Sequence, residues 1–321
     1  MKAFRALLAA LLFSCIGAHA DGPFPNRTIK IVVANPPGGQ TDVATRIIGQ
    51  EMSNILKVPV VIENKPGANS NIGADYVKNQ PADGYTLIVT AINNFGSNPA
   101  LIRNMPFDPV RDFRMIVQTI SSVNVIVVNP QSPYRTLQDI LDAAKANPGK
   151  LTYGSAGAGS SMFLFMELLK SMAHVNIQHV PYQGSARANV DIMGGQIDMQ
   201  FDSMPGAWSL VEGKKLRAIA VSSAKRSPVA PDVPTVAESG VPGFDAESWL
   251  GLAAPKGTPD EVIMILNKAA NQAMSTPRVR DQLLAMGTRP VGGTPQEFTK
   301  FVENQVAMWK QVIASAGIQP Q

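Results

Sequence analysis

The chain has 321 residues, of which 45% are apolar and 16% charged, so it can bury a large core and is not intrinsically disordered. A net charge of +4 without a block of Lys or Arg argues against a nucleic-acid partner. The single cysteine, Cys15, excludes an internal disulfide and a cysteine-based metal cluster. The length is typical of about two domains.

The first twenty residues (1–20) have the order of a secretory signal peptide. Two basic residues precede a mostly apolar stretch, and Ala18-His19-Ala20 supplies a small-residue cleavage site. We therefore predict cleavage after Ala20 and export to the periplasm. Two alternatives stay open: an uncleaved N-terminal anchor and lipid attachment at Cys15.

The first part of the mature chain alternates β-branched runs with amphipathic stretches. Strands are predicted over residues 29–33, 58–62 and 85–90. The apolar positions of the intervening helices are Val43, Ile47, Met52 and Leu56 in the first helix, and Ala74 and Val77 in the second. Because short turns separate these units, their order predicts an α/β fold with a largely parallel sheet.

The same alternation returns later in the chain. Strands are predicted over residues 123–128, 151–154, 177–180, 197–201 and 216–221, with a helix over 160–172. A helix is also predicted after Thr136, which forms a capping-box pattern with Asp139. The sequence therefore predicts two α/β lobes.

The C-terminal part is predicted to be mostly helical. Two segments share one pattern, Thr258-Pro259-Asp260-Glu261 and Thr294-Pro295-Gln296-Glu297. In each we expect Thr to cap the helix, Pro to occupy its first position and Glu to reach back to the cap. After the second segment, an apolar stripe at helical spacing is expected to face the core: Phe298, Phe301, Val302, Trp309, Val312 and Ile313.

Motifs that would indicate catalysis are missing from the mature sequence. His174 is expected to be exposed at a helix end and His179 to be structural, and no H-E-x-x-H occurs. Around Ser155, Tyr153 replaces the first Gly of a nucleophile elbow. No phosphate-binding loop with its Lys and no dinucleotide fingerprint is found. We therefore expect no catalytic residue, no metal and no cofactor.

Two strand-to-helix turns, residues 35–42 and 153–161, combine glycines with hydroxyl side chains. The candidate residues are Gly38, Gly39 and Thr41 in the first turn, and Ser155, Gly159 and Ser160 in the second. A helix N-terminus presents unpaired N–H groups that favour anions, so one turn in each lobe could hold two carboxylates. Each turn taken alone is better explained by tight turning and helix capping, and the occurrence of one such turn in each lobe favours anion binding.

Further polar residues follow predicted strands, where ligands of α/β sheets bind. They are Asn93, Asn94 and Phe95 after the third strand, Gln183 and Gly184 after the strand at 177–180, and Asp202. These side chains suit hydrogen bonding to a small polar ligand. Arg is sparse here, the nearest being Arg46 and Arg187, so backbone groups would supply much of the binding.

A series of motifs in fixed order spans nearly the whole mature chain. They are Asn35-Pro36-Pro37-Gly38-Gly39-Gln40-Thr41-Asp42, Glu63-Asn64-Lys65-Pro66-Gly67-Ala68, Ala82-Asp83-Gly84-Tyr85, Tyr153-Gly154-Ser155, Val180-Pro181-Tyr182-Gln183-Gly184, Gly195-Gln196-Ile197-Asp198, Glu238-Ser239-Gly240, Trp249-Leu250-Gly251 and Ala254-Pro255-Lys256-Gly257-Thr258-Pro259. In this combination the chain resembles the substrate-binding receptors of tripartite tricarboxylate transporters, the Bug receptors. It departs from the family at Pro37, where Ala is common.

The resemblance implies the fold of a type II periplasmic binding protein, with two α/β lobes, a ligand cleft between them and C-terminal helices. It places the two crossing segments near residues 124–128 and 247–252. Lobe one would then comprise residues 21–124 plus 250–321, and lobe two residues 125–249. We expect a monomer that delivers its ligand to the membrane subunits of a tripartite tricarboxylate transporter.

The resemblance also implies roles for the candidate residues. Backbone groups of Gly38, Gly39 and Thr41 would bind one carboxylate, with Asp42 organising the turn or meeting a ligand cation. Ser155, Gly159 and Ser160 would bind a second carboxylate, Asn93, Asn94 and Phe95 would set specificity, and Gln183, Gly184 and Asp202 would complete the pocket. The ligand could be a dicarboxylate, a tricarboxylate, an acidic amino acid or an aromatic acid. An extracytoplasmic enzyme and a partner of a signalling protein are the alternative functions.

Overall fold

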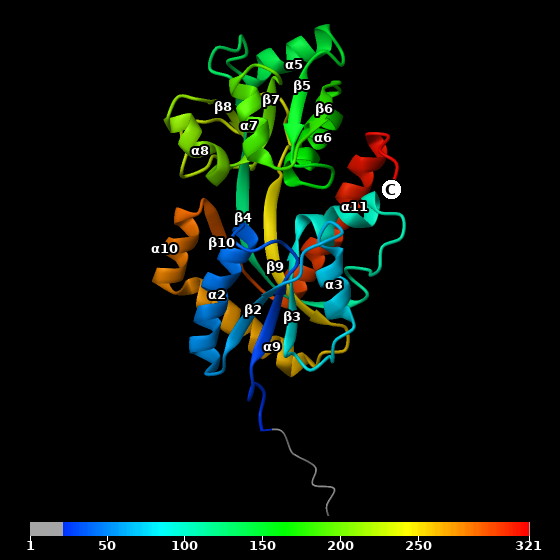
Figure 1. Cartoon of the computed structure of the whole chain (residues 1–321), viewed down its shortest axis with the longest axis vertical. Coiled ribbons are helices and arrows are strands. Elements are labelled where there is room, and N and C mark those ends of the chain that lie inside the picture. The colour runs from blue at the N-terminus through cyan, green and yellow to red at the C-terminus, as the bar shows by residue number, and fades with distance from the viewer. Residues whose placement is uncertain (1–21, 321) are drawn as a thin grey trace, which may run out of the picture.

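The computed structural model describes residues 22–320, so the predicted signal peptide and Cys15 lie outside the described residues. Two sheets, each covered by helices, lie one above the other and are joined by two long strands (Figure 1). Over the described residues, no helix has both the length and the apolar character needed to cross a membrane.

The first sheet has three parallel strands followed by antiparallel ones, in the order β2-β1-β3-β9-β4-β10. Its strands are β1 (Ile29–Val33), β2 (Val60–Asn64), β3 (Thr86–Ala91), β4 (Phe113–Val128), β9 (Glu247–Pro255) and β10 (Thr288–Gly292). One face packs against α2 (Gln40–Leu56), α9 (Asp260–Ser275) and α10 (Pro277–Ala285). The other packs against α3 (Asn71–Lys78), the π-helical turn η1 (Ile92–Ser97), α4 (Asn98–Leu101) and α11 (Pro295–Ser315).

The second sheet pairs β6, β5 and β7 in parallel, and β7 and β8 pair with β4 antiparallel. Its own strands are β5 (Thr152–Ser155), β6 (Gln178–Pro181), β7 (Met199–Ser203) and β8 (Arg217–Val221). Helices α5 (Leu137–Ala146) and α6 (Ser161–Ala173) pack on one face, and α7 (Ser185–Met193) and α8 (Met204–Glu212) on the other. We call each sheet with its helices a lobe.

Strand β4 belongs to both lobes. Residues up to Val123 pair with β9, and from Asn124 onward the strand pairs with β7 and β8 (Figure 1). The pairing therefore changes sheets between two adjacent residues. The lobe boundaries given above stay a prediction.

The C-terminal helix α11 contacts both lobes. Gln305 Oε1 accepts hydrogen bonds from Trp249 Nε1 (3.1 Å) on β9 and from Trp309 Nε1 (3.0 Å). The Trp309 ring stacks on Phe165 of α6 with ring centroids 6.1 Å apart. The apolar stripe predicted for this helix faces the core as expected, with Phe301 only partly buried.

Most predicted elements are present, and four details of the prediction are wrong. The sheets are not largely parallel, because β4 and β9 run antiparallel to the strands with which they pair. Both Thr136 and Thr294 cap their helices through capping boxes, as predicted. Thr258 does not cap α9, because its hydroxyl donates to the Pro255 carbonyl (2.8 Å) and Pro259 takes the cap position. In α2 the buried face is formed by Ala44, Ile48 and Met52, while Val43 is 36% exposed. Strand β4 begins ten residues before the predicted residue 123.

Gly251 on β9 allows the strand to approach its neighbours closely. A Cβ added there would overlap the Phe298 ring and lie 2.8 Å from the Val117 carbonyl oxygen. We expect Gly251→Ala to lower the free energy of unfolding by about 1–3 kcal/mol through overpacking. Urea unfolding measures this, with Gly194→Ala as the control, since a Cβ on Gly194 meets its nearest atom at 3.5 Å. Equal stability of the two variants would contradict the packing argument.

Candidate functional site

The first turn, between β1 and α2, is organised by the Asp42 carboxylate. Its Oδ2 accepts hydrogen bonds from the Gly38 amide (2.9 Å) and from Arg46 Nε (3.0 Å). Asn64 Nδ2 donates to Asp42 Oδ1 (3.0 Å) and to the Asn35 carbonyl (3.1 Å). Asp42 is 3% exposed, so this network holds the backbone of the turn rigidly at the N-terminus of α2.

The same contacts set the charge of Asp42. Burial alone would favour the neutral acid, but hydrogen bonds from Arg46, Gly38 and Asn64 outweigh it and hold the pKa of Asp42 below its ordinary value. The carboxylate is therefore ionised at neutral pH. The side chain serves the turn itself, and a contact with a ligand stays a prediction.

Asp42→Asn should remove the charge-assisted bonds and lower the free energy of unfolding at pH 7 by about 1–3 kcal/mol. Because the folded pKa lies below the unfolded one, this contribution is present above about pH 3.9 and is lost as pH falls through the folded pKa. Urea unfolding at pH 7 and pH 3 measures both effects. Asp75→Asn, which breaks a surface pair with Lys78, is the control and should change little.

The second turn, between β5 and α6, contains two hydroxyls that bond within the turn. Ser155 Oγ is buried, accepts from the Gly157 amide (3.1 Å) and lies 2.7 Å from His179 Nε2. Ser160 caps α6, accepting from the Phe163 amide (3.3 Å) and donating to the Gly157 carbonyl (2.7 Å). These contacts are those of a tight turn with a helix cap, and carboxylate binding by either hydroxyl stays a prediction.

His179 on β6 lies against this turn. Its ring stacks on Tyr153 and packs on Phe163, with both centroids 4.9 Å away. Burial lowers the pKa of His179, the nearby Glu167 carboxylate raises it, and Lys170 lowers it. The imidazole is therefore mostly neutral at pH 7. His174 is exposed at the end of α6, as expected from the sequence.

Since the pKa of His179 is lowered on folding, the unfolded chain takes up this proton first as pH falls below about 6.5. The folded state should thus lose stability between pH 7.5 and 5.5, by less than about 1.4 kcal/mol per pH unit, the ceiling for one group. Urea unfolding at both pH values should show a smaller loss for His179→Gln than for the parent. His174→Gln, an exposed control, should behave like the parent.

The residues after β3 fall into two groups. Asn93 Nδ2 donates to Ser70 Oγ (2.9 Å), to which Asn35 Nδ2 of the first turn also donates (3.4 Å). Asn94 is buried and its Oδ1 accepts from the Ala91 amide (2.8 Å). Phe95 is fully buried, and its ring centroid lies 4.9 Å from that of Phe113. Asn93 therefore faces the turns, whereas Asn94 and Phe95 hold η1 in place.

Sequence reasoning included residues 63–68 among the family motifs but gave no role in the site to the turn at residues 67–70, which lies between the two predicted binding turns. Four consecutive residues have positive φ, with 129° at Gly67 and 46°, 51° and 71° at the three residues that follow. Left-handed backbone costs about 1–2 kcal/mol for each residue that is not Gly, so the fold must hold this turn in place. Asn69 Nδ2 donates to Asn98 Oδ1 (2.7 Å), which supplies part of that support.

This turn touches the second lobe. A Cβ added to Gly159 would lie 3.0 Å from Asn69 Nδ2 and 3.2 Å from Leu101 Cδ1. Asn69 is next to Ser70, which binds the first turn through Asn35. The two predicted turns are thus connected through residues 69–70, and the signal in the sequence was an Asn, which tolerates left-handed backbone, soon after Pro-Gly.

The remaining candidates lie around α7. Gly184 precedes α7 with φ 116°, and Gln183 is exposed. Asp202 is buried and accepts from Asn189 Nδ2 (2.8 Å) and the Ser203 amide (2.8 Å). Burial raises the pKa of Asp202 above its ordinary value. Asp202 therefore joins α7 to the end of β7, and a ligand contact by these three residues stays a prediction.

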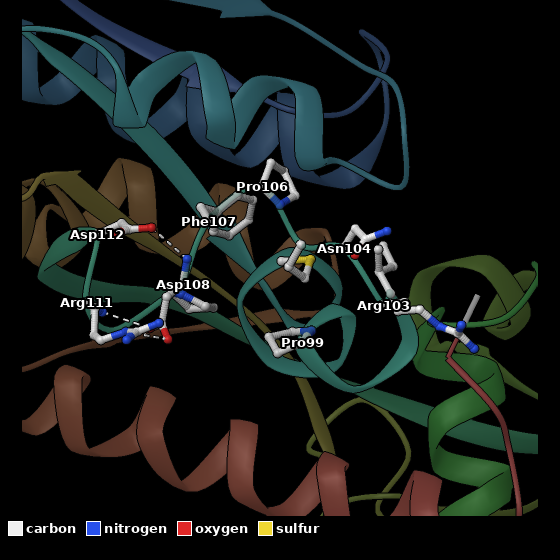
Figure 2. A pocket seen from close by; sticks show the side chains of 11 residues that line it. Pro99, Arg103, Asn104, Pro106, Phe107, Asp108, Arg111 and Asp112 are labelled. Atoms are coloured by element: carbon white, nitrogen blue, oxygen red, sulfur yellow. Dashed lines mark hydrogen bonds and ion pairs between the residues drawn. The ribbon is translucent and has the colours of Figure 1, made fainter.

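Two cavities can be compared with the positions of the predicted binding residues. One of about 30 Å³ lies beside the first turn, lined by Gln40, Thr41, Ile120, Ser122, Ser248, Trp249 and Leu250. A pocket of about 570 Å³ lies over residues 99–112, where Asp108 pairs with Arg111 (3.0 Å) (Figure 2). This larger pocket contains none of the predicted binding residues. Among residues 22–320, no three His, Cys, Asp or Glu side chains gather as metal ligands would.

Comparison with known proteins assigns the family. Residues 44–318 match the model of the tripartite tricarboxylate transporter family receptor. The chain belongs to this receptor family. Protein BugT of Bordetella pertussis is 32% identical over 295 residues, which cover 92% of this chain and 90% of BugT. The resemblance inferred from the sequence motifs is therefore confirmed.

Solved structures of similar receptors confirm the fold of a periplasmic binding protein. Rpa4515 of R. palustris with adipate has a TM-score of 0.81 at 35% identity, covering 93% of this receptor and 100% of that chain. MatC from Rhodopseudomonas palustris with bound malate has a TM-score of 0.77 at 31% identity, covering 90% and 100%. The periplasmic binding protein BugD has a TM-score of 0.78 at 30% identity, covering 93% and 100%. The first two of these relatives were solved with a small dicarboxylic acid, and the third is a periplasmic binding protein.

Proposed function

We propose that this receptor is exported to the periplasm, captures a small carboxylate between its lobes and delivers it to the membrane subunits of a tripartite tricarboxylate transporter. The observation that carries the proposal is the connection between the two turns. The first turn reaches Ser70 through Asn35, and Gly159 of the second turn packs beside Asn69. A small ligand bound beside residues 69–70 would then contact both turns.

The chemistry of both turns suits an anion. Each precedes the N-terminus of a long helix, α2 or α6, whose first N–H groups carry partial positive charge. Arg46, the cation nearest the first turn, already binds Asp42 and Asn64. Backbone amides and hydroxyls would therefore hold the ligand, as at other helix termini that bind anions. The relatives solved with adipate and malate bind dicarboxylates, which supports this ligand class.

Capture follows from the two lobes and the strands that join them. A ligand that contacts both turns binds the closed arrangement better than an open one, so it shifts the population toward closure. The transporter would then recognise the closed shape. Membership of the receptor family supports the delivery step.

One observation favours a second function. Ser155 Oγ and His179 Nε2 lie 2.7 Å apart, a hydroxyl–imidazole pair of the kind used by hydrolases. Against catalysis, the Ser155 hydroxyl is fully buried and accepts a hydrogen bond from the Gly157 amide. We therefore propose that the protein binds its ligand without converting it. Thermal unfolding combined with mass spectrometry tests both binding and catalysis.

The test uses mature protein, residues 21–321, unfolded and refolded to remove any retained ligand. Thermal unfolding is followed with a panel of dicarboxylates, tricarboxylates, acidic amino acids and aromatic acids. The cognate acid at a thousandfold excess over Kd should raise stability by about 4 kcal/mol. Mass spectrometry should recover that acid unchanged after long incubation. No stabilisation by any carboxylate would refute the receptor proposal, and conversion proportional to protein would establish an enzyme.

The second turn can be tested by substitution. If Ser155 and Ser160 hold a carboxylate, Ser155→Ala and Ser160→Ala should each weaken binding by about ten- to a hundredfold. Ser160→Asp should weaken it further, because it places an anion against the ligand. Titration calorimetry gives Kd, and the thermal midpoint of the ligand-free protein separates binding from stability. Ser209→Asp, at an exposed position on α8, is the control and should bind like the parent.

A further inference from the structure

The backbone of the second turn is in contact with the first lobe at Gly159. Gly159 is buried, whereas Ala156 and Ala158 in the same turn are exposed. A Cβ built on Gly159 would meet side chains of the first lobe, with Asn69 Nδ2 at 3.0 Å and Leu101 Cδ1 at 3.2 Å as the nearest atoms. The first lobe therefore covers Gly159, and the two lobes touch where this residue has no side chain.

Asn69 is held firmly on the first-lobe side of this contact. Its Nδ2 donates to Asn98 Oδ1 (2.7 Å), and its carbonyl accepts from Asn98 Nδ2 (2.9 Å). Asn98 is fully buried and also donates to Asn71 Oδ1 (2.8 Å). Residues 68–70 all have positive φ, which is unfavourable for residues other than Gly. Unfavourable backbone that is held in place by buried hydrogen bonds is typical of positions with a role in switching or binding.

The contact with the first lobe accounts for a glycine at position 159 without any ligand. Gly157 and Gly159 both have left-handed backbone, with φ of 97° and 86°. A Cβ on Gly157 would meet no atom within 4 Å, whereas a Cβ on Gly159 would press against the first lobe. Both positions therefore need glycine for the shape of the turn, but only Gly159 needs it for the space between the lobes. Because Asn69 and Gly159 belong to different lobes, opening the lobes would break their contact.

We propose that residues 67–70 form the stop against which the second lobe closes, with Asn69 and Gly159 as the two residues in contact. The inference rests on the proposed function and gives Gly159 a role in closure that is separate from the carboxylate contact predicted for it. The ligand binds the closed arrangement better than the open one. Anything that keeps Gly159 away from Asn69 therefore lowers the fraction of competent receptor and raises the apparent Kd.

Gly159→Ala tests this contact, and Gly157→Ala is its matched control. Both variants place a side chain at positive φ in the same turn, so both should lower the thermal midpoint of the ligand-free protein by a similar amount. Only Gly159→Ala places a methyl group between the lobes. Titration calorimetry with malate, adipate and the other acids that bind the parent should show Kd raised about tenfold or more by Gly159→Ala. Gly157→Ala should stay within about threefold of the parent.

A change in the first lobe should relieve the defect. Asn69→Gly suits the left-handed backbone and removes the side chain that faces Gly159, while Leu101 Cδ1 is the end of a flexible side chain and can shift. The double variant Gly159→Ala with Asn69→Gly should bind at least about threefold tighter than Gly159→Ala alone. Small-angle scattering with saturating acid should show a smaller decrease in radius of gyration for Gly159→Ala than for the parent or the double variant.

Equal Kd values for Gly159→Ala and Gly157→Ala would overturn the inference while leaving the receptor proposal intact. A defect that Asn69→Gly does not relieve would also overturn it, because the new methyl group would then obstruct the acid itself. If Gly159→Ala does not fold, Asn69→Gln lengthens the opposing side chain and should raise Kd in the same way, and an unchanged Kd would overturn the inference. If no carboxylate stabilises the parent protein, the proposed function fails and the closure stop fails with it.

Discussion

The constraint on which the architecture depends is the continuity of β4. Sixteen residues form one strand that pairs with β9 and β10 in the first sheet and with β7 and β8 in the second. A strand shared by two sheets fixes the register of both, because a slip of one residue would turn its side chains to the wrong faces in each lobe. Strands β1 and β5, which precede the two turns, belong to these two sheets, so the shared strand β4 places the turns relative to one another.

The proposed site on this frame consists mainly of neutral groups. Asp42 and Arg46 neutralise one another inside the first turn, and Ser155 and Ser160 are tied to their own turn. The proposed site therefore offers amides and hydroxyls together with the N-terminal ends of α2 and α6. A carboxylate held there would be bound by preorganised dipoles, so specificity would depend on where each amide and hydroxyl is held.

The sequence predicted the elements well because their signals are local. Alternating β-branched runs, the capping boxes at Thr136 and Thr294, and the stripe along α11 each depend on residues within one or two turns of chain. The prediction that Thr258 caps α9 was wrong because the Thr258 hydroxyl donates to the Pro255 carbonyl instead. That carbonyl comes within reach only because the chain turns back at this point. The left-handed turn at residues 67–70 had only a weak local signal, the Asn that follows soon after Pro-Gly, and its contact with the second lobe depends on long-range packing that the sequence does not show.

The position of α11 has a consequence for motion. Trp309 is held at one edge by Gln305 and stacks on Phe165 of the other lobe, while Gln305 also binds Trp249 of β9. A rotation that moved α6 away from the first lobe would separate the Trp309 and Phe165 rings but leave the indole bonded to Gln305. Opening the lobes would therefore expose one face of the Trp309 ring to water, which costs free energy and opposes the motion. The environment of the Trp309 indole would change with the distance between the lobes.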